Sequence, residues 1–212
     1  MTGLIFQDAI MIKFFTNREV SKRLDINLSK WKRWSREFLP PDPLGGMQSG
    51  FARQYSPDGA FTVYLGGHLV ADLKFTIPEA KQIVKDLHSW FAEKGFYFNA
   101  RSNGTVNQGE DKLIKKYIIV IEREKDPGNA IGFMYTIRGI ISNEPVNYNG
   151  FEIMKELYRE TTIGLPPKKM SIIDMNIVNL LNITDVLNSF VVRLNLNRSR
   201  YSALSSTNSN RS

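Results

Sequence analysis

Cationic side chains cluster in one short segment of the chain. Between residues 28 and 38, Ser29 and four cations lie among apolar residues; the cations are Lys30, Lys32, Arg33 and Arg36. In the DNA major groove, lysine and arginine reach guanine edges and phosphates, and serine can bond either. These residue types favour contact with DNA. The alternative is an ordinary amphipathic helix whose basic face is solvated.

Two short helices and a tight turn are expected to position these side chains. Thr16 and Glu19 have the spacing of a capping box, which predicts a first helix that ends near Leu24. Residues 25–27 then predict a turn that ends in Asn27, the expected N-cap of the second helix. The apolar stripe expected on the inner face of that helix consists of Leu28, Trp31, Trp34 and Phe38.

A glycine-bounded loop follows the second helix. Residues 44–50 are expected to form a flexible hairpin turn, and residues 51–55 are expected to form a short strand after it. Arg53 and Tyr55 are two positions apart and therefore share one face of that strand. Both side chains could lie on the phosphate backbone of DNA. The alternative is a plain surface hairpin in which Tyr55 packs on the second helix.

The segment TNREVSKRLDINLSKWKRWSREFLPP, followed by GFARQYS, resembles the MerR family of winged helix-turn-helix regulators. The resemblance covers about residues 13–90. It implies that the second helix enters the major groove and that a wing arginine and tyrosine hold phosphate. The candidate DNA-binding residues are Thr16, Arg18, Ser29, Lys30, Lys32, Arg33, Arg36, Arg53 and Tyr55.

The chain also departs from the MerR pattern. Ala52 adds one residue between the glycine-aromatic pair and the wing arginine. The cysteines that sense metals or redox state in several family members are absent, and no long dimerising coiled coil is evident. Metal-responsive activation therefore does not carry over from the resemblance.

The charge distribution supports binding to a polyanion. The 212-residue chain has a net charge of +7, and residues 13–55 contain nine basic residues against four acidic ones. Four more arginines and no acids follow from Arg193 onward. Positive charge concentrated in one segment and a tail is the pattern of a nucleic-acid-binding protein. The alternative is that the charge only keeps the protein soluble.

Composition and motifs argue against several other classes of protein. Without cysteine, the chain has no disulfides, thiolate metal ligands or cysteine nucleophile, and its two histidines cannot supply a multi-histidine metal site. No P-loop, GxGxxG, GxSxG or HExxH motif is present. We therefore expect no enzymatic activity and no cofactor. No apolar run reaches membrane-spanning length and no secretory signal is evident, so we expect a cytoplasmic, nucleoid-associated protein without membrane contact.

Residues 56–75 admit two interpretations. Their apolar residues fit a helix, but they also alternate around Gly66 and Gly67 as in a hairpin. We expect the helix, because the family resemblance requires one here. Thr76 and Glu79 form a second capping-box pattern, which predicts a helix that runs to about Lys94.

The pattern of the second half of the chain predicts strands followed by helices. Residues 116–123 and 131–141 predict an antiparallel pair, and residues 96–101 also have strand character. A short helix is expected at 150–160, a strand or helix at 170–181, and a helix capped near Thr184 that ends near Leu194. The expected class is α+β: an extension (1–12), a winged helix-turn-helix domain (13–95), a small α+β domain with an antiparallel sheet (96–194) and a disordered basic tail (195–212).

These patterns predict a sequence-specific regulator of transcription that binds double-stranded DNA, with a homodimer as the expected state. The second domain would dimerise or bind a small-molecule or protein effector. Two alternatives remain open. One is an excisionase-like architectural or recruiting protein of a phage or mobile element, and the other is an interaction module whose basic face binds an acidic protein.

Overall fold

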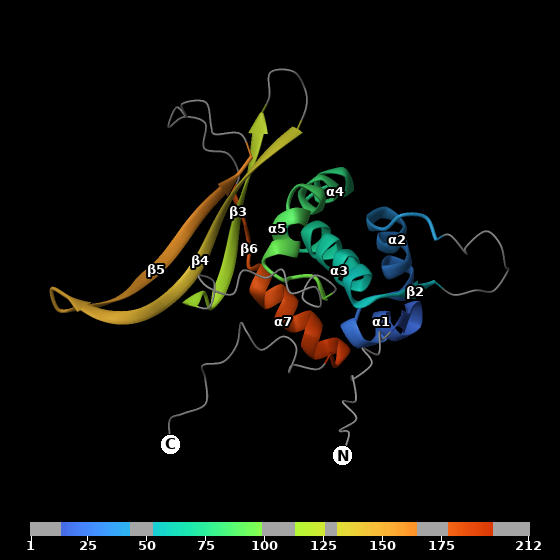
Figure 1. Cartoon of the computed structure of the whole chain (residues 1–212), viewed down its shortest axis with the longest axis horizontal. Coiled ribbons are helices and arrows are strands. Elements are labelled where there is room, and N and C mark those ends of the chain that lie inside the picture. The colour runs from blue at the N-terminus through green and yellow to red at the C-terminus, as the bar shows by residue number, and fades with distance from the viewer. Residues whose placement is uncertain (1–13, 43–52, 99–112, 126–130, 165–177, 197–212) are drawn as a thin grey trace, which may run out of the picture.

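The computed structural model describes residues 14–42, 53–98, 113–125, 131–164 and 178–196. Within these ranges the chain is α+β, with six helices and two antiparallel sheets. Figure 1 shows a body of helices packed against one end of a four-stranded sheet. A two-stranded part of that sheet extends away from the helices as an arm (Figure 1). The α+β class expected from the sequence is confirmed.

The first two helices are joined by the expected turn. Helix α1 spans Asn17–Leu24 and helix α2 spans Leu28–Phe38. Asp25 ends α1 in the left-handed conformation, with φ of 57°. Asn27 Oδ1 accepts hydrogen bonds from the Ser29 and Lys30 amides at 2.9 and 3.3 Å, so the expected N-cap of α2 is confirmed.

The capping box expected at the start of α1 forms only in part. Thr16 Oγ1 accepts a hydrogen bond from the Glu19 amide at 3.3 Å, as the sequence predicts. The Glu19 carboxylate does not complete the box, because it lies 3.0 Å from the Arg23 guanidinium one turn along the same helix. An ion pair within the helix thus replaces the reciprocal half of the box.

A small sheet and a glycine-containing helix support α2. Strands β1 (Phe15–Thr16) and β2 (Gln54–Tyr55) pair in antiparallel fashion. The loop expected to form the wing tip, residues 44–50, lies outside the described residues. Helix α3 spans Pro57–Ala71, so the helical interpretation of this region is confirmed and the hairpin interpretation is wrong.

The two central glycines of α3 allow α2 to approach closely. A Cβ atom on Gly67 would lie 2.3 Å from the Trp34 ring, and one on Gly66 would lie 2.6 Å from the Phe38 ring. Any larger residue would therefore push the aromatic side of α2 outward. The glycine pair that resembles a hairpin turn in the sequence serves instead as a contact between helices.

The single helix expected after Thr76 is two helices in the structure. Helix α4 spans Ile77–Asp86 and helix α5 spans His88–Glu93, with the break at Leu87. The capping box between Thr76 and Glu79 is complete, as expected. Gly95 ends the segment at φ of 70°. Residues 96–98 are not in a strand, so this part of the strand expected at 96–101 is wrong, and residues 99–101 lie outside the described ranges.

The larger sheet has the strand order β5-β4-β3-β6. Strands β3 (Lys116–Lys125) and β4 (Ile131–Tyr148) form the expected antiparallel pair. Strand β5 (Phe151–Ile163) replaces the short helix expected at 150–160, because these residues pair along their length with β4. The sequence left strand or helix open for 170–181. The described part of this range is strand β6 (Val178–Leu181).

The last helix brings the second half of the chain back to the first. Helix α7 (Ile183–Leu194) is capped by Asn182, whose side chain accepts a hydrogen bond from the Asp185 amide, rather than by Thr184. Its buried Thr184 hydroxyl instead accepts a hydrogen bond from the Tyr117 amide at 2.8 Å. One hydrophobic cluster contains side chains from α1 to α7, so the core is continuous across residue 95.

Two arginines join the ends of α1 and α7. Arg193 Nη1 donates to the Leu24 carbonyl at 2.7 Å, and Arg23 Nη1 donates to the Leu194 carbonyl at 3.0 Å. Each arginine thus satisfies a carbonyl left free at the C-terminal end of the other helix. The first and last helices are therefore held together by charged donors as well as by apolar packing.

Candidate nucleic-acid interface

The outer face of α2 is cationic and exposed. Its five candidate residues, Ser29, Lys30, Lys32, Arg33 and Arg36, are all exposed. At 100° per residue, Ser29, Arg33 and Arg36 project within about 60° of one another, with Lys30 and Lys32 on either side. The sequence therefore placed these residues correctly on the faces of the helix away from its buried stripe.

The inner face of α2 is anchored by aromatic rings. Trp31 is fully buried, and its ring meets the Tyr55 ring edge-on at a centroid distance of 5.5 Å. Trp34 is also buried, at 6 % exposure, and packs on Gly67. Leu28 and Phe38, expected in the same stripe, are only partly buried. The two tryptophans thus fix the rotation of α2, and with it the direction of the outer cations.

One acidic side chain borders the cationic face. The Glu37 carboxylate lies 2.8 Å from Lys81 of α4. A hydrogen bond from Lys81 lowers the pKa of Glu37, with smaller contributions from Arg33 and Arg36. Glu37 is therefore held by a cation of another helix. Within the described residues, Lys32, Arg33 and Arg36 form no ion pair.

Lys30 has a contact of its own within α2. Its Nζ lies 4.7 Å from the centre of the Trp34 ring, in a cation–π arrangement. This contact holds the lysine stem along the flank of the helix. The remaining ammonium surface stays exposed to solvent.

The α1 candidates are exposed as well. Thr16 is exposed, but its hydroxyl already accepts the Glu19 amide as an N-cap. Arg18 is exposed on α1. Lys22, which the candidate set omitted, is exposed one turn after Arg18 and joins it on one side of the helix. In the sequence, the i, i+4 spacing of Arg18 and Lys22 is the signal that indicates Lys22 as a further candidate residue.

Tyr55 has to be removed from the candidate DNA-binding residues. Its side chain is only 2 % exposed, and its hydroxyl donates to Asn17 Oδ1 at 2.6 Å. A buried and bonded phenol cannot lie on a phosphate backbone. The alternative interpretation, in which Tyr55 packs on the second helix, describes its contact with Trp31.

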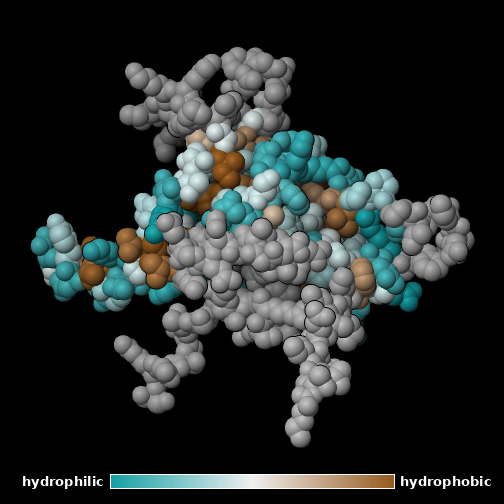
Figure 2. Space-filling view, viewed as in Figure 1, coloured by the Kyte–Doolittle hydropathy of each residue, from teal (hydrophilic) through white to brown (hydrophobic). Residues whose placement is uncertain are grey.

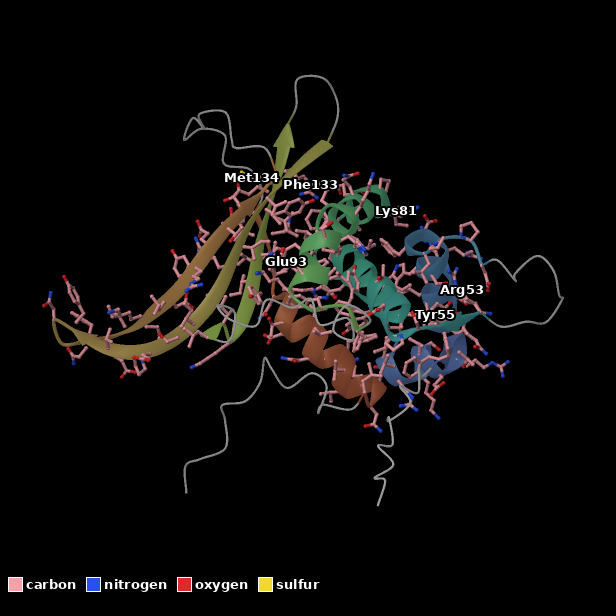
Figure 3. The ribbon with its side chains drawn as sticks, viewed as in Figure 1. Arg53, Tyr55, Lys81, Glu93, Phe133 and Met134 are labelled. Atoms are coloured by element: carbon pink, nitrogen blue, oxygen red, sulfur yellow. The ribbon has the colours of Figure 1, made fainter. Side chains whose placement is uncertain are left out.

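Arg53 is held at the edge of the same region. Its Nη2 donates to the Pro40 carbonyl at 2.7 Å, and its guanidinium lies 5.8 Å from the centre of the Tyr55 ring. Figure 3 shows Arg53 and Tyr55 on the side of the helical body that faces away from the large sheet. The arginine therefore remains beside α2, with guanidinium donors to spare for a further partner.

The described residues contain no group of three or more histidine, cysteine or acidic side chains that could hold a metal ion. Among the same residues, no helix is both long and apolar enough to cross a membrane. No protein-family model and no curated protein matches the chain. The geometry of α1, α2 and β2 is therefore the observation on which a functional proposal must rest.

Proposed function

We propose that the chain binds double-stranded DNA as a sequence-specific regulator of transcription and places the outer face of α2 in the major groove. One observation carries the proposal: α2 presents a serine and four exposed cations on its outer side, while Trp31 and Trp34 lock its inner side. Such a helix has the width and donors that the major groove accepts. The protein would then act at the nucleoid in the cytoplasm.

The two helices and the small sheet fit a winged helix-turn-helix arrangement, which is part of this proposal. Helix α2 would read base edges through Ser29, Lys32 and Arg33. Arg18, Lys22 and Arg36 would hold the phosphates on either side, and Arg53 would hold phosphate beside the wing. Contacts to phosphate set the register, while contacts to bases provide sequence preference.

A single helix-turn-helix unit of this size contacts only a few base pairs. A homodimer on two half-sites would supply the affinity and the spacing that a regulator needs. The four-stranded sheet is the part of the chain left to pair copies or to receive an effector. The proposed partners are therefore double-stranded DNA and a second copy of the chain.

Replacement of Arg33 by alanine tests the proposal. The preferred duplex is first identified by selection from random sequences. Arg33→Ala should then reduce affinity for that duplex by about 1–3 kcal/mol and relax the preference at one base position, because a bidentate contact to guanine is lost. Fluorescence anisotropy with the selected duplex and with single-base variants measures both effects.

Lys115→Ala is the matched control. Lys115 is exposed but lies at the start of the large sheet, so its loss removes the same unit of charge away from α2. It should leave the base preference unchanged. If Arg33→Ala behaved like this control, or if selection enriched no sequence, the assignment of α2 as the reading helix would be wrong.

A further inference from the structure

The β4–β5 hairpin carries an apolar surface that no other described part of the chain covers. We define the β-arm as residues 142–158, the part of this hairpin beyond the irregularity between Ile140 and Ser142. Figure 2 shows brown apolar residues set between hydrophilic ones along this projection. Its exposed large apolar side chains are Tyr148, Phe151, Ile153, Met154, Leu157 and Tyr158, with exposed fractions of 41 % to 75 %. Such a row on a monomer marks an interaction surface.

Most of these side chains share one face of the sheet. Side chains alternate along a strand, and Ile163 of β5 packs against the core on the side that the helices cover. The same alternation places Leu157, Ile153 and Phe151 on that side. Their face is therefore a continuation of the core face of the sheet, beyond the end of the helices.

The register adds partners from β4 to this face. Ile153 lies opposite Val146, and Phe151 lies opposite Tyr148. Cross-strand neighbours occupy the same face, so the apolar surface is two strands wide. The opposite face differs in character, because it carries Glu152 and Glu156 around Met154. The β-arm is thus a ribbon with one apolar side and one acidic side.

The charges of the β-arm argue against DNA and against a strongly charged partner. Its glutamates make it unsuited to DNA, whose phosphates require cations. The apolar face carries one lysine and one glutamate, Lys155 and Glu144, which the register places opposite each other. That face is therefore neutral and favours neither an acidic nor a basic partner. Two copies of it would match in apolar character and in charge.

Strand β5 is also an edge strand of the larger sheet. Over 13 residues, one side of its backbone has no strand partner among the described residues. A long edge without a described strand partner, beside exposed apolar side chains, is a liability that proteins cover. A second copy can cover the edge and the apolar face together, because a two-fold interface uses the same surface twice.

We propose that two copies of the chain dimerise through the apolar face of their β-arms. The proposal deepens the DNA-binding function and rests on it for the expectation of paired half-sites, whereas the oligomeric state itself is measured without DNA. It leaves α1 and α2 accessible, because they lie on the side of the helical body away from the sheet (Figure 1). Arg53 lies on the same side (Figure 3).

Leu157→Arg is the test, and Leu180→Arg is its matched control. Both leucines are exposed, at 54 % and 61 %, and they lie on the two opposite edge strands of the same sheet. Wild-type protein and Leu180→Arg should sediment as dimers. The dissociation constant of the dimer should rise at least about 100-fold in Leu157→Arg, because a two-fold interface contains each substitution twice. A monomeric wild type, or a dimer that survives Leu157→Arg, would overturn the proposal.

A second measurement does not depend on weakening the dimer. The chain has no cysteine, so Ile153→Cys introduces a single thiol. A bismaleimide that spans about 10 Å, the spacing of packed sheets, should link two copies at this position. The same reagent should not link Leu180→Cys. Efficient linkage at Leu180 and none at Ile153 would place the interface on the other edge and refute the assignment.

DNA binding separates this proposal from the proposed function. Leu157→Arg should keep wild-type affinity for a duplex with one half-site and lose the added affinity for a duplex with two. If neither protein bound any duplex while Leu157→Arg still became monomeric, the β-arm proposal would stand and the DNA-binding proposal would fail.

Discussion

Arg53 shows how one side chain can serve the fold and remain available to a ligand. It donates to the Pro40 carbonyl at 2.7 Å, which ties the start of β2 to the chain after α2. Arginine has five N–H donors, so one such bond leaves others for phosphate. Its place beside α2 thus suits a contact that adds affinity without reading sequence.

Arg53→Ala should weaken binding to selected and unselected duplexes by the same factor. The loss of one phosphate contact should also reduce the slope of log affinity against log salt by about one. Arg53→Lys is the control, since it keeps the charge and should keep most of the slope. Anisotropy titrations over a series of salt concentrations measure the slope, and a loss confined to the selected duplex would show that Arg53 reads bases instead.

At the residue scale, caps and helix faces could be predicted because they depend on near neighbours. The Asn27 cap involves residues two and three positions away, and the exposed face of α2 follows from its helical period. The burial of Tyr55 could not be predicted, because its partner Asn17 is 38 positions away. Alternation along a strand shows which side chains share a face, but not which face becomes covered.

At the element scale, the packing of α2 on α3 decides where the proposed reading helix lies. Two glycines in the middle of a helix cost conformational entropy, which lowers helix propensity by about 1 kcal/mol each relative to alanine. Here they allow Trp34 and Phe38 to lie against the α3 backbone. The contact between the helices compensates for the weak intrinsic propensity of α3.

Gly67→Ala tests this account. The new methyl group would lie 2.3 Å from the buried Trp34 ring, so we expect a net destabilisation of about 1–2 kcal/mol despite better helix propensity. Gly59→Ala is the control, since its methyl group would meet Ser56 and Leu39 at 3.4 Å or more. Urea unfolding compares the two variants. Equal stability in both would mean that the α2–α3 contact readily adjusts.

The helix predicted where β5 lies is the largest error among the elements expected from the sequence. Residues 150–160 contain glutamate, lysine, leucine and methionine, which favour helices as isolated residues. Pairing with β4 overrides that preference, because a strand is stabilised by cross-strand contacts that local propensity does not contain. The resulting edge strand carries the proposed dimer surface. The wrong helix prediction therefore also concealed the surface on which the dimer proposal is based.

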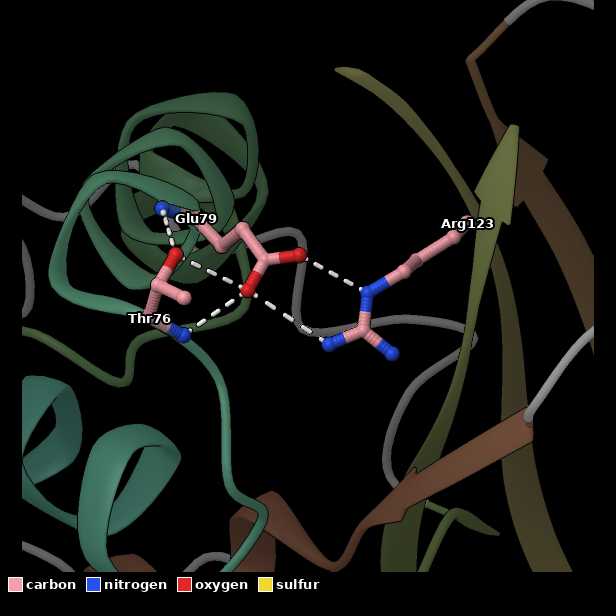
Figure 4. Close-up of polar contacts among 3 residues, drawn as sticks. All are labelled: Thr76, Glu79 and Arg123. Atoms are coloured by element: carbon pink, nitrogen blue, oxygen red, sulfur yellow. Dashed lines mark hydrogen bonds and ion pairs between the residues drawn. The ribbon is translucent and has the colours of Figure 1, made fainter. Parts of the chain in front are cut away.

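At the scale of the whole molecule, one buried carboxylate joins the helical body to the sheet. Glu79 of α4 is 7 % exposed and lies 2.8 Å from Arg123 of β3. Its other oxygen accepts the Thr76 amide at 2.7 Å, which completes the capping box (Figure 4). The hydrogen bond from Arg123 lowers the pKa of Glu79, although burial acts in the opposite direction.

Glu79→Gln should reduce the free energy of unfolding by about 2 kcal/mol at neutral pH, because a charge-assisted bond is lost and Arg123 keeps a weaker acceptor. A carboxyl whose folded-state pKa is lowered stabilises the fold above its unfolded pKa. That stabilisation is lost as pH falls through the folded value. The difference between wild type and variant should therefore shrink below the ordinary value of 4.5.

Urea unfolding at neutral pH and near pH 3 measures this difference. Glu37→Gln is the control, because Glu37 pairs with Lys81 at the surface and its replacement should change stability little. A gap between wild type and Glu79→Gln that stayed constant with pH would show that packing, and not the charge of Glu79, joins the two parts.

The sequence by itself determined the features that depend on neighbouring residues: both helices of the cationic segment, the cap at Asn27, the exposed cations of α2 and the β3–β4 pair. Only the tertiary structure decided the burial of Tyr55, the strand at β5, and the links from Arg193 to α1 and from Arg123 to Glu79. The physical reason is distance along the chain. Local hydrogen bonds and helical periodicity depend on residues only a few positions apart. The other contacts join segments that meet only once the core has formed.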